Sequence, residues 1–145
     1  MRGNLSRLAV AVAAAVGLSL GTGTAFATPP GPGVTGTIIA QTTKGGTDRI
    51  LRQTTVPPGR STGRHCHDGP LYAYVQQGRL SHFDAGCAFD GVYRAGSRLT
   101  EPSGEDHVHI GRNLGTTPVV LDVLYVLPHG APLFEDAPNP GCDFA

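Results

Sequence analysis

Short β-type segments separated by turn residues follow one another from residue 35 onward, and this alternation constrains the fold more than any other feature. Glycine occurs 21 times and proline 12 times in the 145 residues. Outside the N-terminal leader, no segment keeps a helical period for more than two turns. About eight short strands at regular spacing predict an all-β sandwich or closed barrel. The candidate strands are residues 35–43, 49–56, 64–67, 71–77, 80–83, 92–95, 107–112 and 119–127.

The N-terminus has the order of charges and apolar residues that is typical of a secretory signal peptide. Arg2 and Arg7 flank a short basic region, residues 8–20 form an apolar run, and Ala25-Phe26-Ala27 follows as a cleavage pattern. The run is shorter than the ~18–20 residues that a membrane-spanning helix needs. We therefore expect residues 1–27 to be cleaved and the protein to be secreted, with no membrane contact afterwards.

The remaining chain divides into a linker and one domain. Residues 28–34 (TPPGPGV) form a Pro/Gly linker, and residues 35–145 are expected to form a single domain whose tail becomes irregular from about residue 129. Loss of Arg2 and Arg7 would leave 9 basic side chains (11 minus 2) against 11 acidic ones. The absence of a basic patch argues against a nucleic-acid partner.

Four of the six histidines form two H-x-H pairs, His65/His67 and His107/His109. Residues two apart on a strand point to the same face, so each pair presents two imidazoles together. Neutral imidazole is a common ligand of divalent transition metals. The pairs therefore predict a metal site, and the alternative is that these histidines are polar side chains without a ligand role. His82 and His129 have no such partner in spacing and are expected at the surface.

The residues around the two pairs form two longer motifs. The first is Gly59-x5-His65-x-His67-x10-Gly78, and the second is Gly96-x5-Pro102-x-Gly104-x2-His107, with Asn113 shortly after. These resemble the two motifs of the cupin superfamily, G-x5-H-x-H-x3,4-E-x6-G and G-x5-P-x-G-x2-H-x3-N. The resemblance implies a cupin jelly-roll β-barrel that holds a divalent transition metal such as Fe, Mn, Zn, Ni or Cu.

Two departures from these motifs bear on the metal site. The glutamate of the first motif should fall at position 71 or 72, where this chain has Leu71 and Tyr72, and Glu101 is interpreted as a solvated turn carboxylate. Without a carboxylate, three imidazoles would leave the full +2 charge on the ion. Asn113 follows His109 by four positions, not His107. Either histidine could therefore be the second-motif ligand. We favour His107 because the preceding turn fixes its place, with His109 as a fourth ligand.

The segment 71–75 alternates apolar and aromatic residues. If Leu71, Ala73 and Val75 lie on the face of the histidines, they form an apolar pocket wall for a small-molecule ligand. The stretch at residues 65–70 (HCHDGP) also resembles a group of small secreted bacterial cupins in which the glutamate is routinely absent. That resemblance implies a fold and no particular reaction.

Three cysteines allow at most one internal disulfide. Cys87 lies in a loop-like stretch and Cys142 in the tail, and a bridge between them would pin the tail to the domain. We favour this pair. The alternative is that all three cysteines are buried thiols, and Cys66 is expected to point away from its two histidine neighbours.

Three functions are compatible with these patterns. The first is a secreted cupin that binds a divalent transition metal through a three-histidine cluster. The second is a metal-dependent dioxygenase, isomerase or lyase acting on a small molecule. The third is a metal-free small-molecule or sugar-binding barrel in which the histidines only line the cavity. Cupins often pair through sheet edges, so a homodimer is also conceivable.

Overall fold

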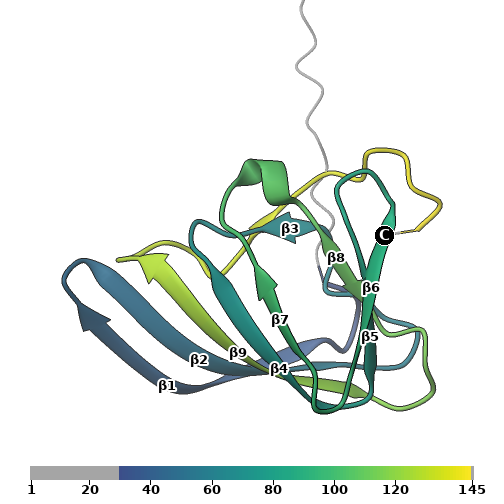
Figure 1. Cartoon of the computed structure of the whole chain (residues 1–145), viewed down its shortest axis with the longest axis horizontal. Helices are drawn as coiled ribbons and strands as arrows, with labels where there is room; N and C mark the ends of the chain where they lie inside the picture. The colour runs from purple at the N-terminus through teal and green to yellow at the C-terminus, as the bar shows by residue number, and fades with distance from the viewer. Residues whose placement is uncertain (1–29, 145) are drawn as a thin grey trace, which may run out of the picture.

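The computed structural model describes residues 30–144, so the expected signal peptide lies outside the described residues. Nearly all of the regular structure is β, as the alternation of strands and turns predicted (Figure 1). Two strands were not expected, at Arg98–Glu101 and Glu135–Asp136, and the expected strand at 107–112 begins only at Ile110, after a short 3-10 helix. The elements are β1 (Thr35–Lys44), β2 (Thr47–Val56), β3 (His65–Cys66), β4 (Leu71–Gln77), β5 (Arg79–Phe83), β6 (Phe89–Arg94), β7 (Arg98–Glu101), η1 (Glu105–His107), β8 (Ile110–Arg112), β9 (Val119–Pro128) and β10 (Glu135–Asp136).

The strands form three antiparallel sheets. The largest has the order β1-β2-β9-β4-β7, a second has the order β6-β5-β8, and β10 pairs with β3 alone. In Figure 1 the long strands of the first sheet sweep across the lower left, β5, β6 and β8 stand at the right, and β3 lies in the upper middle, to the left of β8. Neighbours such as β2 and β9 are far apart in the sequence, which is typical of a barrel with long-range strand pairing.

The core lies on the inner face of β4 and β9, where sequence alternation and burial agree. Leu71, Ala73 and Val75 are buried, while the intervening Tyr72 and Tyr74 are exposed. On β9 every second residue from Val119 to Leu127 is buried in the same way. Each buried Val or Leu side chain contributes roughly 1.5–3 kcal/mol relative to an exposed one, so these two strands supply much of the driving force for folding.

Glycine is required at two kinds of turn. Gly45 and Gly46 join β1 to β2 with φ angles of 60° and 73°, the conformation that a tight hairpin needs. Gly78, at the end of the first motif, has φ 82°, and a Cβ there would lie 2.5 Å from the Pro118 carbonyl oxygen. The motif glycine thus allows β4 to turn into β5 directly against the backbone that leads into β9.

Cys87 and Cys142 lie at disulfide distance, with their Cα atoms 5.7 Å apart, as the sequence favoured. The bond closes a loop of 55 residues, which corresponds to about 4 kcal/mol in the chain-entropy model. Cys66 is a buried free thiol. The disulfide fastens the C-terminal tail to the loop between β5 and β6.

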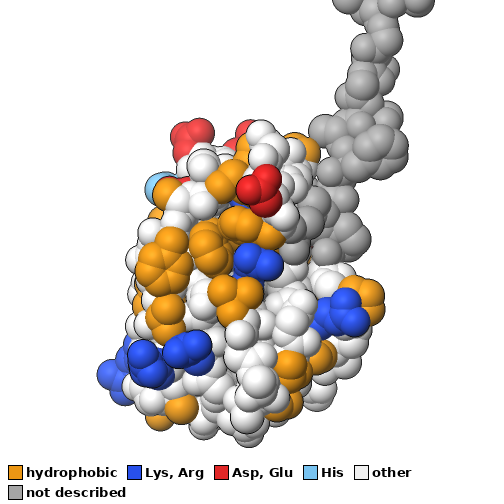
Figure 2. Space-filling view, turned by 90° about the vertical axis from the view of Figure 1, so that its right-hand side faces the viewer, with side chains coloured by type: hydrophobic (Ala, Val, Ile, Leu, Met, Phe, Trp, Pro, Cys, Tyr) orange, Lys and Arg blue, Asp and Glu red, His pale blue; other side chains and the backbone are white. Residues whose placement is uncertain are grey.

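The surface carries charges of both signs and several exposed hydrophobic side chains. On the face seen in Figure 2, hydrophobic groups gather between acidic and basic ones. Phe89 and Val92 of β6 are among the exposed large hydrophobic residues of the protein. Strand β1 is exposed along its whole length and forms one edge of the large sheet. Pairing of two copies through that edge stays a prediction. Within residues 30–144, no helix has the length and apolar character needed to cross a bilayer.

The Asp48 carboxylate joins the two strands of the β1–β2 hairpin, next to their turn, to the residues that follow β9. Asp48 accepts hydrogen bonds from the Thr43 hydroxyl at 2.5 Å, from Nδ1 of His129 at 2.9 Å and from the Gly130 amide at 3.0 Å. These contacts, led by the Thr43 hydrogen bond, lower the pKa of Asp48 to about 2. His129 is otherwise a surface residue, as expected, with 66% of its side chain exposed.

We predict that Asp48→Asn removes a pH-dependent part of the stability. A carboxylate whose pKa is lower in the folded than in the unfolded chain stabilises the fold above its unfolded pKa, and this contribution is lost as pH falls through the folded value. The free energy of unfolding in urea should therefore be lower for Asp48→Asn than for the wild type at pH 7, and the two should converge between pH 4 and pH 2. A difference that is constant over this range would contradict the assignment.

Candidate metal centre

Four buried side chains converge inside the barrel: His65, His67, Glu101 and His109. One potential ligand atom from each lies within 4.8 Å of the other three. Opposite ligands of one ion are about 4.2 Å apart when each bond is about 2.1 Å long, so the cluster is close to the size of a single coordination shell. Three imidazoles and one carboxylate form a donor set that suits a divalent transition metal.

Backbone pairing brings the two histidine motifs together. The His65 amide donates to the His109 carbonyl at 3.1 Å, and the His109 amide donates to the His65 carbonyl at 3.0 Å. Residues paired in this way carry their side chains on the same face of the sheet. Their ring centroids are 4.5 Å apart, and His67 adds a third ring 4.8 Å from that of His65.

Each of the three rings is oriented by a backbone carbonyl. Nδ1 of His65 lies 2.9 Å from the Gly63 oxygen, Nδ1 of His67 lies 2.7 Å from the Leu133 oxygen, and Nδ1 of His109 lies 2.8 Å from the His107 oxygen. A carbonyl only accepts hydrogen bonds, so each Nδ1 must carry a proton and donate it. Each Nε2 of a neutral ring then holds a lone pair. This is the arrangement by which proteins usually orient histidine ligands.

Glu101 supplies the carboxylate that the sequence analysis considered missing. Glu101 ends β7 and pairs directly with Leu71 on β4. Leu71 occupies the position where the cupin motif has its glutamate, so here the carboxylate comes from the neighbouring strand. The Oε2 atom of Glu101 lies 3.1 Å from Nε2 of His67 and 3.0 Å from Nε2 of His109. The interpretation of Glu101 as a solvated turn residue is corrected, and so is the expectation that only imidazoles would face the ion.

A positive charge, carried by a proton or by a metal ion, would reconcile these contacts. Burial lowers the pKa of His65 to about 3, so this ring stays neutral. Burial alone would raise the pKa of Glu101, but its contacts with His109, His67 and His82 outweigh that effect and lower the pKa well below its usual value. A hydrogen bond to the carboxylate needs a proton on Nε2, so without a metal ion a ring that also donates from Nδ1 would have to carry a proton on both nitrogens. Lone pairs that face one another repel, and a shared proton or metal ion between them would remove the repulsion.

The structure places His107 outside the cluster. It is an exposed residue at the end of η1, whereas His109 is buried and lies in the cluster. The cupin motif has two residues between this glycine and the histidine, whereas four residues separate Gly104 from His109, and the short helix accommodates the two extra ones. The spacing from His109 to Asn113 then equals the H-x3-N spacing of the motif. Counting back from Asn113 would have identified His109. The preference for His107 as the second-motif ligand is therefore reversed.

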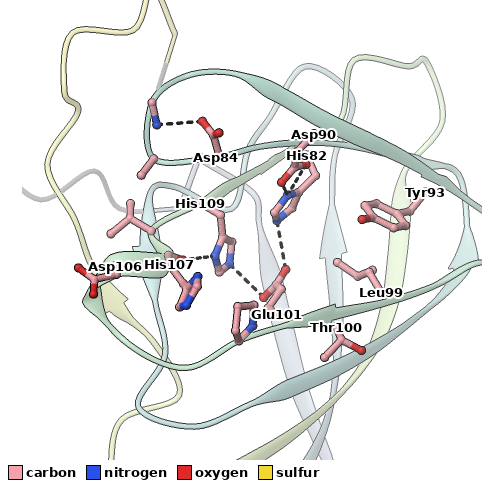
Figure 3. A pocket seen from close by; sticks show the side chains of 14 residues that line it. His82, Asp84, Asp90, Tyr93, Leu99, Thr100, Glu101, Asp106, His107 and His109 are labelled. Carbon is pink, nitrogen blue, oxygen red and sulfur yellow. Dashed lines mark hydrogen bonds and ion pairs between the residues drawn. The ribbon is translucent and has the colours of Figure 1, made fainter.

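His82 is also buried, contrary to the surface position expected for it. Its Nδ1 lies 2.8 Å from an Asp90 oxygen, and its Nε2 lies 3.5 Å from Oε1 of Glu101 (Figure 3). Burial by itself would lower the pKa of His82, but the Glu101 and Asp90 carboxylates outweigh it, and the pKa is raised. His82 thus connects the carboxylate of the cluster to β6. Nothing in its sequence spacing indicated this role.

A cavity of about 330 Å³ opens beside the cluster. Glu101, His109 and His82 form part of its wall, and His107 lies on the wall beside His109 (Figure 3). Of the residues expected to form an apolar pocket wall, Leu71 and Ala73 line a smaller inner cavity of about 40 Å³ that His65 and Glu101 also line. Val75 is fully buried in the core.

Comparison with solved structures identifies the fold. The chain is similar to an uncharacterised double-stranded β-helix protein from Klebsiella pneumoniae (TM-score 0.58, 20% identity, 76% of this chain and 90% of that chain). It is also similar to a cupin domain from Bordetella pertussis (TM-score 0.55, 21% identity, 66% and 94%). A cupin superfamily protein from Desulfitobacterium hafniense matches at TM-score 0.54 and 12% identity, over 65% of this chain and 77% of that one.

The fold assignment rests on the comparison of structures alone. No protein-family model matches the chain, and no curated protein is similar to it in sequence. The three structural neighbours named above share 12–21% of their residues with it, so they bear on architecture and not on activity. The expected jelly-roll architecture is confirmed: this chain has the double-stranded β-helix fold of the cupins.

Proposed function

We propose that this protein is a secreted cupin that binds one divalent transition metal ion through His65, His67, His109 and Glu101. The observation that carries the proposal is the convergence of three imidazoles on one buried carboxylate, which Nε2 of His67 and of His109 contact, with every Nδ1 held by a backbone carbonyl. Without a cation this arrangement brings acceptors together in a buried space, which is costly. A metal ion satisfies all four groups at once.

The donor set limits the identity of the ion to a class. Three imidazole nitrogens and one carboxylate oxygen suit Fe, Mn, Zn, Ni or Cu, whereas Mg and Ca prefer oxygen ligands alone. Glu101 reduces the net charge of the site from +2 to +1. The ion should accordingly be held more tightly than by three histidines alone.

The ligand of this site would be a small molecule in the 330 Å³ cavity. Glu101 and His109 lie in its wall, so a molecule bound there would be in contact with the metal centre. Asp84, Asp90 and Tyr93 also line the cavity and provide polar groups that could orient such a molecule. A bound metal would act as a Lewis acid toward an oxygen or nitrogen of this ligand.

The cavity favours an enzyme as the second candidate. A metal with protein ligands on one side and an open cavity on the other can bind a substrate directly, as in catalytic metal sites generally. The reaction would be that of a metal-dependent dioxygenase, isomerase or lyase. A metal-free binding barrel is the remaining alternative, and it requires ligand binding that a chelator does not affect.

Secretion is part of the same proposal. The signal-like residues 1–27 support it, and so does the Cys87–Cys142 pair, because disulfides persist mainly in oxidising compartments outside the cytosol.

We predict that a divalent transition metal stabilises the protein. A ligand that binds only the folded chain adds about 2.7 kcal/mol at a hundred times its dissociation constant, so zinc at that level should raise Tm by roughly 10 °C over chelator-treated protein. Calorimetry and elemental analysis should agree on one ion per chain. No bound metal and an unchanged Tm for every metal of the class would refute the proposal.

Glu101→Gln keeps the size of the side chain but removes its charge. We expect zinc affinity to fall by more than about tenfold, measured by competition with a chromophoric chelator, because a neutral amide is a poorer ligand than a carboxylate. The matched control is Glu105→Gln in η1, an exposed carboxylate close in sequence, which should leave the affinity within twofold. Equal effects of the two changes would remove Glu101 from the ligand set.

The two histidines of the second pair should differ in the same assay. His109→Ala removes a ligand and should weaken zinc binding by more than the roughly 10–100-fold that loss of an outer partner costs. His107→Ala should leave the affinity nearly unchanged, because the backbone oxygen of residue 107 that orients His109 remains. The reverse order would show that the ion uses His107.

A further inference from the structure

The C-terminal tail makes direct contact with the metal ligands. The carbonyl of Leu133 accepts the hydrogen bond from Nδ1 of His67 at 2.7 Å. The other two rings take their carbonyl partner from two residues earlier in their own strand region, at Gly63 and His107. His67 alone depends on a distant segment, 66 residues away in sequence. Loss of the tail would therefore release this ring in particular.

The tail also pairs with the short strand that carries His65 and directly precedes His67. β3 contains only His65 and Cys66, and β10 pairs with it in the register Asp136 to His65 and Glu135 to Cys66. On the other side of β3, His65 pairs with His109. The ring of Phe134 lies 5.7 Å from that of His65. β10 thus holds the ligand strand against the second-motif ligand.

The far end of the tail is fastened to the wall of the cavity. Cys142 is bonded to Cys87 in the loop between β5 and β6, and Asp84, Ala85 and Gly86 of the same loop line the cavity. The guanidinium of the buried Arg64 contacts both Cys142 Sγ and the Asp84 carbonyl. The disulfide therefore fixes the tail and the cavity loop together.

Phe144 adds a contact at the end of the tail. Its ring lies 4.7 Å from the ring of Phe83, and the Arg112 guanidinium lies 4.3 Å from its centroid. Such pairs contribute little when each is taken alone. The covalent bond is therefore the main restraint on this end of the tail.

We propose that residues 133–142 are a positioning element of the metal site, and that the Cys87–Cys142 disulfide makes metal affinity depend on the redox state of the protein. The inference rests on the proposed metal function. A dithiol would donate two electrons and two protons, the S–S bond would break to give two thiols, and the dithiol would become a cyclic disulfide. The freed tail would withdraw the Leu133 carbonyl from His67, which could then turn or change tautomer.

The test compares zinc affinity with and without the disulfide. Cys87→Ser/Cys142→Ser removes the bond, and the matched control is the same double variant treated with a phosphine, because it has no disulfide left to reduce. Chelator competition should give a dissociation constant about 10–100-fold weaker for the double variant, the usual cost of losing a group that orients a histidine ligand. Phosphine treatment should weaken zinc binding to the wild type by a similar factor and should leave the double variant within threefold of its untreated value. An equal dissociation constant in wild type and double variant would overturn the proposal.

A second measurement separates positioning from a general loss of stability. In metal-free wild-type protein, the ¹⁵N shifts of His67 should show the proton on Nδ1, and in the double variant they should show a mixture of tautomers. His65 and His109, whose carbonyl partners are local, should keep the Nδ1 proton in both proteins. A change at all three rings, or at none, would contradict a specific effect of the tail.

The two readouts distinguish the failure of this inference from that of the proposed function. If the wild type binds no metal, the proposed function fails, and the ¹⁵N shifts still report whether the tail positions His67. If the double variant does not fold, wild-type protein reduced with a phosphine takes its place. The phosphine becomes a phosphine oxide with oxygen from water as two thiols form. Unchanged His67 shifts and unchanged zinc affinity in fully reduced, folded protein would overturn the proposal.

Discussion

The meeting of three imidazoles with the Glu101 carboxylate is the interaction on which the interior of this barrel depends. Each ring directs its Nε2 inward because its Nδ1 is engaged by a carbonyl. A buried carboxylate that faced only lone pairs would be strongly destabilising. The same carboxylate and the three rings would form a stable arrangement around a cation. The site is therefore built for a positive charge, which a divalent metal supplies most completely.

The surrounding fold can be understood as the support of this cluster. The inner faces of β4 and β9 form an apolar base, and the backbone pair of His65 and His109 closes the barrel above it. The rest of the support comes from outside the two motifs. β7 brings the carboxylate, and the tail brings a carbonyl to His67 and a partner strand to β3. Reduction of the Cys87–Cys142 disulfide at the end of that tail would therefore change how His67 is oriented.

Sequence patterns predicted the architecture well and the site only in part. Alternation at residues 119–127 and the motif glycines are local signals, so the strands and turns they imply appear in the structure. Glu101 was missed because β7 is a strand of four residues beside a turn, although Leu99 and Glu101 alternate as inward residues do. His109 was ranked below His107 because a 3-10 turn shifts the register locally. The contact between Leu133 and His67 has no sequence signal, because it depends on where a tail without a periodic pattern folds back.

Anomalous diffraction from a crystal of the zinc-loaded protein, recorded at the zinc edge, tests the central claim most directly. We predict one strong peak per chain, bounded by the Nε2 atoms of His65, His67 and His109 and by the carboxylate of Glu101. Protein that is saturated with zinc in solution but shows no peak there, or a peak whose ligands include His107 in place of His109, would contradict it.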